Sequence, residues 1–165
     1  MAPDQALRQF AQSIAIYRDP IEIGAALHVL TANVIGVRLF TLTAINVKAG
    51  HVRRVYSSHL DIYPLLGTKP LERDAWFDQM QNQGTISVIN RAEDMEGNFT
   101  DLDLIRSIGC NASISIPARA GGKLLGTINA LDVEGQYTPE RVEAAQALLV
   151  PAVAAFLLLS QHFVA

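Results

Sequence analysis

The short turns between strand-like segments constrain this chain more than any other feature. Residues 38–47 and 51–58 are rich in the β-branched and aromatic side chains that favour strands, and only three residues, 48–50, separate them. Three residues cannot make the crossover that parallel strands require, so we expect an antiparallel hairpin. Residues 112–118 and 123–131 repeat the pattern around a glycine-rich turn, and residues 85–89 add a short strand.

Helical patterns flank these strands at both ends of the sequence. Apolar residues recur every three or four positions over residues 7–17, which indicates a first helix. Asp19 is placed to cap a second helix, which Gly36 ends. A long apolar helix is expected over residues 138–163, with a kink at Pro151.

The segment between the two hairpins has a mixed pattern. Residues 60–71 and 90–98 indicate loops, residues 72–82 a helix, and residues 100–108 a shorter helix. The order of elements predicts an α/β (α+β) fold with an antiparallel sheet of five or six strands. The terminal helices would cover one face, and loops and short helices would cover a pocket on the other.

Charge and hydropathy exclude two classes of partner. The net charge is -3, and the longest basic run is Arg53-Arg54, so nucleic acid is not an expected partner. The apolar run at residues 147–159 is shorter than the ~18 residues of a membrane-spanning helix and contains Pro151. A membrane is therefore not expected either, and the location expected is cytoplasmic.

Cysteine and histidine usage limits the chemistry further. A single cysteine, Cys110, excludes an internal disulfide and a cysteine-based zinc site. The four histidines are scattered without metal-ligand spacing, so no metal is expected. The length suits one domain over residues 1–165.

Four short segments in the second half of the sequence occur in a characteristic order: Ile108-Gly109-Cys110-Asn111-Ala112, Ile116-Pro117, Gly122 to Leu131, and Tyr137-Thr138-Pro139. Together they resemble the second half of a GAF domain, and two helices followed by a hairpin resemble the first half. The resemblance implies a sensory or regulatory domain that binds a small molecule and commonly forms a homodimer through its terminal helices. It leaves the ligand, and any cofactor, unidentified.

The sequence departs from several ligand-specific subgroups of that family. It lacks the Asn-Lys-Phe-Asp-Glu run of the cyclic nucleotide-binding members, and Cys110 lies outside the context expected for bilin attachment. The free methionine sulfoxide reductases need an attacking and a resolving cysteine. With one cysteine, that redox enzyme is a disfavoured alternative, and the chain is expected to be non-catalytic.

Candidate ligand-binding residues fall into two groups outside the final hairpin. Polar groups at the end of the second strand would line the cavity mouth, although they could equally cap turns. Aromatic residues would shape the cavity, although aromatics at such spacing more often pack in a core. Cys110 is a further candidate for which inert packing is favoured. The group at the cavity mouth consists of Ser57, His59, Asp61 and Tyr63, and the aromatic group consists of Phe40, Tyr56 and Trp76.

The last hairpin carries polar residues at alternate positions of apolar strands. Ser113 and Ser115 share one face of their strand, and Thr127 and Asn129 share one face of theirs. A three-residue turn, 120–122, would place Ser115 opposite Thr127 and collect all four in one polar patch facing the cavity. A two-residue turn would split them between the faces. We favour the patch; the alternative is that these side chains satisfy neighbouring backbone groups.

The function expected from the sequence is reversible binding of a small polar or aromatic molecule in sensing or regulation. One rival is a homodimerisation module without a ligand, using Leu157 and Leu158 on the last helix. A second is the redox enzyme that depends on Cys110, and a third is an inherited pocket that binds no ligand.

Overall fold

Six strands form one antiparallel sheet across residues 1–163, the part of the chain that the computed structural model describes. The sheet order is β3-β2-β1-β6-β5-β4. Both predicted hairpins are present, and their inner strands β1 and β6 pair at the centre of the sheet. The strands are β1 (Leu39–Asn46), β2 (His51–Ser57), β3 (Lys69–Pro70), β4 (Ser87–Ile89), β5 (Ala112–Ala120) and β6 (Lys123–Asp132).

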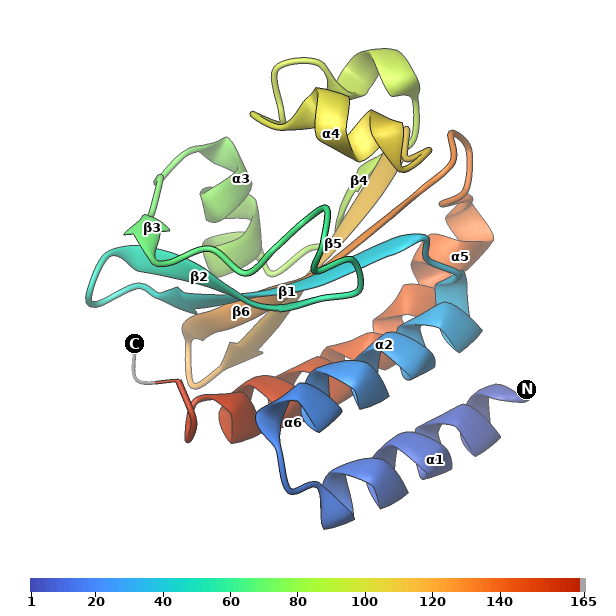
Figure 1. The fold of residues 1–165 in the computed structure, drawn as a ribbon, viewed down its shortest axis with the longest axis vertical. Coiled ribbons are helices and arrows are strands. Elements are labelled where there is room, and N and C mark those ends of the chain that lie inside the picture. The colour runs from blue at the N-terminus through green and yellow to red at the C-terminus, as the bar shows by residue number, and fades with distance from the viewer. Residues whose placement is uncertain (164–165) are drawn as a thin grey trace.

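The terminal helices form a layer on one face of this sheet, as the sequence predicts, and the first helix packs on the outer side of the second (Figure 1). Asp19 caps α2 by accepting a hydrogen bond from the amide of Ile21 at 2.9 Å, and Gly36 ends that helix with a φ of 75°. We call this side of the sheet the helix face. The helices are α1 (Pro3–Ile16), α2 (Pro20–Ile35), α5 (Pro139–Ala144) and α6 (Leu149–Leu159), with the 3₁₀ turn η3 (Ala145–Leu148) between the last two.

The sequence predicts one long C-terminal helix with a kink at Pro151. In the structure a 3₁₀ turn before Pro151 divides it into two α-helical segments. Proline has no N–H to donate to the carbonyl of Ala147, and the tighter 3₁₀ turn η3 precedes it. The stretch Pro139–Leu159 is long and apolar enough to cross a membrane by length and composition, a test that a core helix also passes. Here Ala152, Ala155 and Phe156 are buried in the core beneath the sheet.

The helix face is apolar along its three central strands. Leu42 on β1, Ile128 on β6 and Ile116 on β5 are direct cross-strand partners, and all three are fully buried. They belong to the main hydrophobic core, to which α2 and α6 also contribute. Burying each such side chain stabilises the fold by about 1.5–3 kcal/mol.

Residues 58–111 cover the opposite face, which we call the cover face. They include α3 (Ala75–Asp78), the π-helical turn η1 (Gln79–Gln83), the 3₁₀ turn η2 (Ala92–Met95) and α4 (Leu102–Ser107). α3 and α4 lie over different parts of the sheet (Figure 1). Each contributes to its own apolar cluster: the α3 cluster holds Ile45, Phe77, Met80 and Leu124, and the α4 cluster holds Leu39, Tyr63, Met95, Leu102, Ile105, Cys110 and Leu131.

Three details of this covering segment differ from the sequence prediction. The helix expected over 72–82 starts at Ala75, because the carboxylate of Asp74 caps it by accepting from the Phe77 amide at 2.9 Å. Its second half is π-helical. The loop expected over 60–71 contains the two-residue strand β3, which pairs with β2 at the sheet edge, where a proline is tolerated.

Candidate functional site

A row of polar side chains crosses the cover face through five strands. Ser57 pairs with Thr41, Thr41 with Asn129, Asn129 with Ser115, and Ser115 with Ser87. Direct cross-strand partners share a face of the sheet, so these five side chains form one band. The band, called here the polar row, runs between the α4 cluster and the α3 cluster.

Asn129 is the centre of a hydrogen-bond network in this band. Its Oδ1 accepts from the hydroxyls of Ser115 at 3.2 Å and Thr127 at 3.1 Å. Its Nδ2 donates to the hydroxyls of Thr41 at 3.4 Å and Thr43 at 3.2 Å. We call these five residues the Asn129 network. They come from β1, β5 and β6, so the amide ties three strands together on the cover face.

The orientation of the Asn129 amide gives its neighbours opposite hydrogen-bonding character. Thr43 accepts from Nδ2, so its own hydroxyl proton remains free to donate. Ser115 donates to Oδ1, so its lone pairs remain free to accept. Both are partly exposed, as is Asn129, whereas Thr41 and Thr127 are buried. The network therefore presents a donor on its β1 side and an acceptor on its β5 side.

Arg54 adds a positive charge on the β1 side of the network. It is the cross-strand partner of Thr43, and its guanidinium lies 3.7 Å from the centroid of the Tyr63 ring. Its Nη1 also donates to the carbonyl of Pro64 at 2.7 Å. Burial, followed by a hydrogen bond with Asp101, raises the pKa of Tyr63 above its usual value. The tyrosine stays neutral, and the guanidinium is held beside the donor end of the network.

The register of the last hairpin differs from the one expected, yet the polar residues still gather. The turn has two residues, Gly121 and Gly122. By itself, a turn of this length would place Ser113 and Ser115 on the opposite face of the sheet from Thr127 and Asn129. A register shift between Ala118 and Arg119 inserts one extra residue in β6 and restores the parity. Ser115 consequently lies opposite Asn129, not opposite Thr127 as expected.

Residues expected at the cavity mouth are engaged in local turns. The amide of His59 donates to Ser57 Oγ at 3.2 Å, and the His59 ring lies 2.8 Å from the hydroxyl of Ser58. Asp61 is exposed in the same turn. Ser57 is therefore at the end of the polar row, while His59 interacts with its sequence neighbours.

Two aromatic candidates lie on the other side of the sheet. Phe40 is fully buried in the helix-face core and stacks on His28 of α2 with the ring centroids 4.8 Å apart. Tyr56 packs against the same core and meets the Phe40 ring edge to face. The expectation that Phe40 shapes a cavity on the cover face is wrong, because the pleat points its side chain to the helices.

The remaining candidates flank the Asn129 network. Trp76 packs beside the α3 cluster. Ser113 is buried and is the cross-strand partner of Leu131, not of Asn129 as expected. Cys110 is fully buried in the α4 cluster. Burial, then the nearby carboxylate of Asp132, raises the pKa of its thiol to about 11. A neutral, enclosed thiol is the opposite of the exposed thiolate that redox catalysis requires.

Sequence reasoning missed Thr41, Thr43, Ser87 and Arg54. Thr41 and Thr43 alternate with Phe40, Leu42 and Ala44, so the period of two could have revealed them. Ser87 gives no comparable signal, because its place in the polar row depends on the pairing of β4 with β5. Arg54 gives none either, because a register shift between Leu42 and Thr43 in the first hairpin brings it opposite Thr43. Within residues 1–163, no group of three or more His, Cys, Asp or Glu side chains could hold a metal ion.

The comparison with known families agrees with this geometry. The family model for the GAF domain matches residues 5–155. The chain belongs to the GAF domain family. GAF domains are small-molecule-binding regulatory and sensory domains. The curated proteins include none that matches this chain in sequence.

Solved GAF domains share the fold at low sequence identity. The phycocyanobilin-bound GAF domain of a cyanobacterial phytochrome has a TM-score of 0.71 at 13% identity, covering 100% of this chain and 99% of its own. The GAF domain of a phosphoenolpyruvate-protein phosphotransferase from Coxiella burnetii has a TM-score of 0.71 at 11% identity, with coverage of 97% and 95%. Free methionine-R-sulfoxide reductase from Neisseria meningitidis, solved with its substrate, has a TM-score of 0.67 at 14% identity, with coverage of 98% and 92%.

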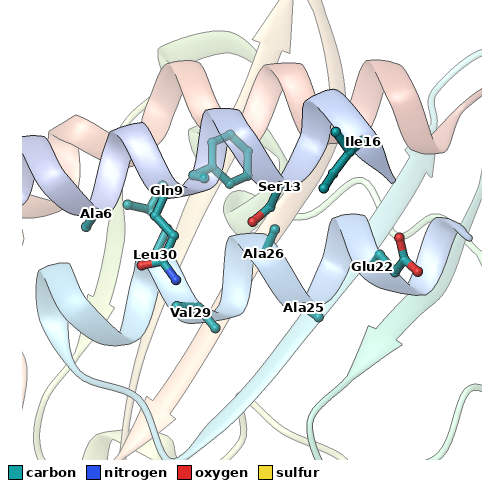
Figure 2. Close-up of a pocket in the computed structure, with 10 residues that line it drawn as sticks. Ala6, Gln9, Ser13, Ile16, Glu22, Ala25, Ala26, Val29 and Leu30 are labelled. Atoms are coloured by element: carbon teal, nitrogen blue, oxygen red, sulfur yellow. The ribbon is translucent and has the colours of Figure 1, made fainter. Parts of the chain in front are cut away.

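This GAF domain also has a shallow groove on its outer helices. The groove lies between α1 and α2, has a volume of about 350 Å³, and is lined mainly by small and apolar side chains (Figure 2). Ile16 and Val29 line it and are 78% and 46% exposed. It is separate from the cover face, so it offers apolar surface on the helical side of the molecule.

Proposed function

We propose that this GAF domain binds a small polar molecule on the Asn129 network, without transforming it, as a sensory or regulatory step. The observation that supports this is the network itself. Five hydrogen-bonding side chains from three adjacent strands gather in the middle of the cover face, between the apolar α3 and α4 clusters. Burying polar groups in that position lowers stability unless they are paired. The partial exposure of Thr43, Ser115 and Asn129 leaves hydrogen-bonding capacity for a ligand.

The polarity of the network defines the ligand's chemistry. An acceptor group, such as a carbonyl, carboxylate or phosphate oxygen, would face the Thr43 hydroxyl and Arg54. A donor group would face Ser115. The two hydroxyls come from strands two apart in the sheet and lie on either side of the Asn129 amide, which each contacts at 3.2 Å. This arrangement suits a metabolite with an acceptor-rich or anionic end and a donor at the other, with apolar parts towards the α3 and α4 clusters.

A melting screen against polar metabolites tests this proposal. A ligand should raise the melting midpoint of the wild-type chain as its concentration exceeds Kd. Asn129→Asp keeps the shape of the side chain but makes it a pure acceptor, so Thr43 must turn its hydroxyl towards it and lose its free donor. The shift should then fall or vanish. Ile128→Val, on the next residue of β6 but the opposite face, should keep the full shift.

The result against the proposal is also defined by these variants. A metabolite that stabilises Asn129→Asp as strongly as wild type binds elsewhere. A methionine sulfoxide reductase activity that depends on an external thiol and is lost in Cys110→Ser would support the redox alternative instead. The buried thiol with its raised pKa is the reason to expect none.

We also propose that the chain forms a homodimer through its helical layer. Val150 and Leu157 lie seven residues apart on α6, and so on one helix face, and are 79% and 48% exposed. Leu158 is partly buried beside the core. Sedimentation velocity over a range of concentrations should show a dimer in wild type and a monomer in Val150→Glu with Leu157→Glu. A wild-type chain that stays monomeric contradicts this.

A further inference from the structure

A second cavity lies at the end of the sheet, away from the Asn129 network. It has a volume of about 440 Å³, within the range of small-molecule sites. It is bounded by the end of β1, the start of β6 and the end of α6. The lining residues are Ala44, Ile45, Asn46, Val47, Lys48, Lys123, Leu124, Leu125, Phe156, Leu159, Ser160 and Phe163.

The wall beneath the α6 end is built by a close approach of helix and sheet. Gly126 has no Cβ, and a methyl group there would lie 2.3 Å from the Phe156 ring and 2.5 Å from the Thr43 carbonyl oxygen. The ring therefore packs directly on the β6 backbone. Phe156 and Leu159 are buried, so this wall is fixed by the main core.

The charge on the rim has one sign. Lys48 and Lys123 are exposed and both line the cavity, and its lining includes no carboxylate side chain among the described residues. The chain has only three lysines, so two of them meet at this cavity. Arg53 lies beside it, with its guanidinium 5.2 Å from the centroid of the Phe163 ring. A hollow with apolar walls and a cationic rim matches a molecule with an apolar body and an anionic head.

We propose that this cavity, here called the lysine pocket, binds an amphipathic anion. The aliphatic or aromatic body lies against Leu125, Phe156 and Leu159. A carboxylate or similar anionic head meets the ammonium groups of Lys48 and Lys123 at the solvent edge. The apolar contacts provide affinity, and the two lysines select an acid over the corresponding alcohol. This site is distinct from the Asn129 network and does not depend on it.

The test titrates the full chain with decanoate, kept below its micelle concentration, and with decanol as the uncharged match. Calorimetry gives the affinity, and backbone NMR spectra locate the site. We expect saturable decanoate binding with shifts confined to residues 44–48 and 123–125 and the neighbouring end of α6. Lys48→Gln with Lys123→Gln should weaken decanoate binding on the order of tenfold, since each exposed ion pair contributes modestly. The same pair of substitutions should leave decanol binding unchanged.

Two further variants separate the pocket from general effects. Leu125→Trp fills the cavity and should abolish binding of both compounds, with the fold checked by its melting curve. Lys69→Gln removes the third lysine, which does not line the cavity, and should bind decanoate as wild type does. Equal decanoate affinity in the double lysine variant, or binding that survives Leu125→Trp, would overturn the proposal. Absence of saturable decanoate binding in wild type would overturn it too. A concentration-dependent dimer that Leu125→Trp abolishes would also overturn it, because a second copy of the chain would then occupy the pocket.

Discussion

The two faces of the central sheet are built from alternate residues of the same strands, yet they differ in kind. On the helix face, Leu42, Ile128 and Ile116 form a fully buried apolar row beneath α2 and α6. On the cover face, one residue further along β1 and β6, Thr43 and Asn129 belong to the hydrogen-bonded Asn129 network. Both faces are covered, so exposure to solvent alone does not explain the difference.

The contrast separates stability from recognition within one sheet. The helix face gains free energy from apolar burial and needs no polar groups. The cover face divides its apolar contacts between the α3 and α4 clusters and places hydroxyls and an amide between them. A buried hydrogen bond contributes only about 1 kcal/mol net. The Asn129 network thus adds little stability and is suited to holding a polar ligand.

The largest effect is expected from truncating the helix face. Ile128→Ala removes a fully buried side chain from the centre of the core, so it should lower the free energy of unfolding by about 3 kcal/mol. Urea unfolding measures this. A loss no greater than that of a substitution on the cover face of β6 would break the distinction between the faces.

A smaller effect is expected from the titration of Cys110, the thiol in the α4 cluster. Its pKa is raised from 9.0 to about 11 in the folded chain. The unfolded thiol loses its proton first as the pH rises, so the stabilisation is complete below about pH 9 and is lost between 9 and 11. The loss should be on the order of 2 kcal/mol. Urea unfolding at several pH values compares wild type with Cys110→Ala, which should not show this loss of stability between pH 9 and 11. Identical pH profiles of the two proteins would show that the α4 cluster does not exclude water.

A still smaller effect is expected from Thr127→Val on the cover face. Valine keeps the volume but removes one of the two hydroxyls that donate to Asn129 Oδ1, and Ser115 still donates to it. The free energy of unfolding should fall by about 1 kcal/mol. Compared with Ile128→Ala in the same urea experiment, this places the two faces on one scale. A loss as large as that of the isoleucine variant would make the network a structural element.

The smallest effect is expected from Tyr137→Phe. The Tyr137 hydroxyl is buried and has no hydrogen-bond partner among the described residues. Removing it leaves no group unpaired, so the free energy of unfolding should change by no more than about 0.5 kcal/mol, in the stabilising direction if at all. A large destabilisation in the same assay would mean that the hydroxyl has a partner, such as an ordered water, and is part of the helix-side core.

The sequence predicted those features that depend on local patterns. The hairpins, the Asp19 cap and the order of elements follow from periodicity and turn residues, and all appear in the structure. The pairing within the last hairpin could not be predicted, because a two-residue turn and a bulge near Ala118 change the register by one residue each. Thr41 and Thr43 enter the network only because β1 pairs with β6, which brings Asn129 to residues that are 88 and 86 positions away in the sequence.

Native mass spectrometry of the purified chain tests the ligand-binding claim most directly, because it detects a bound molecule by its mass whatever its identity. We expect the wild-type chain and Ile128→Val to retain the same small molecule, with an acceptor-rich or anionic end, and Asn129→Asp to lose it. Equal retention of that molecule by Asn129→Asp would show that the Asn129 network is not where this GAF domain binds its ligand.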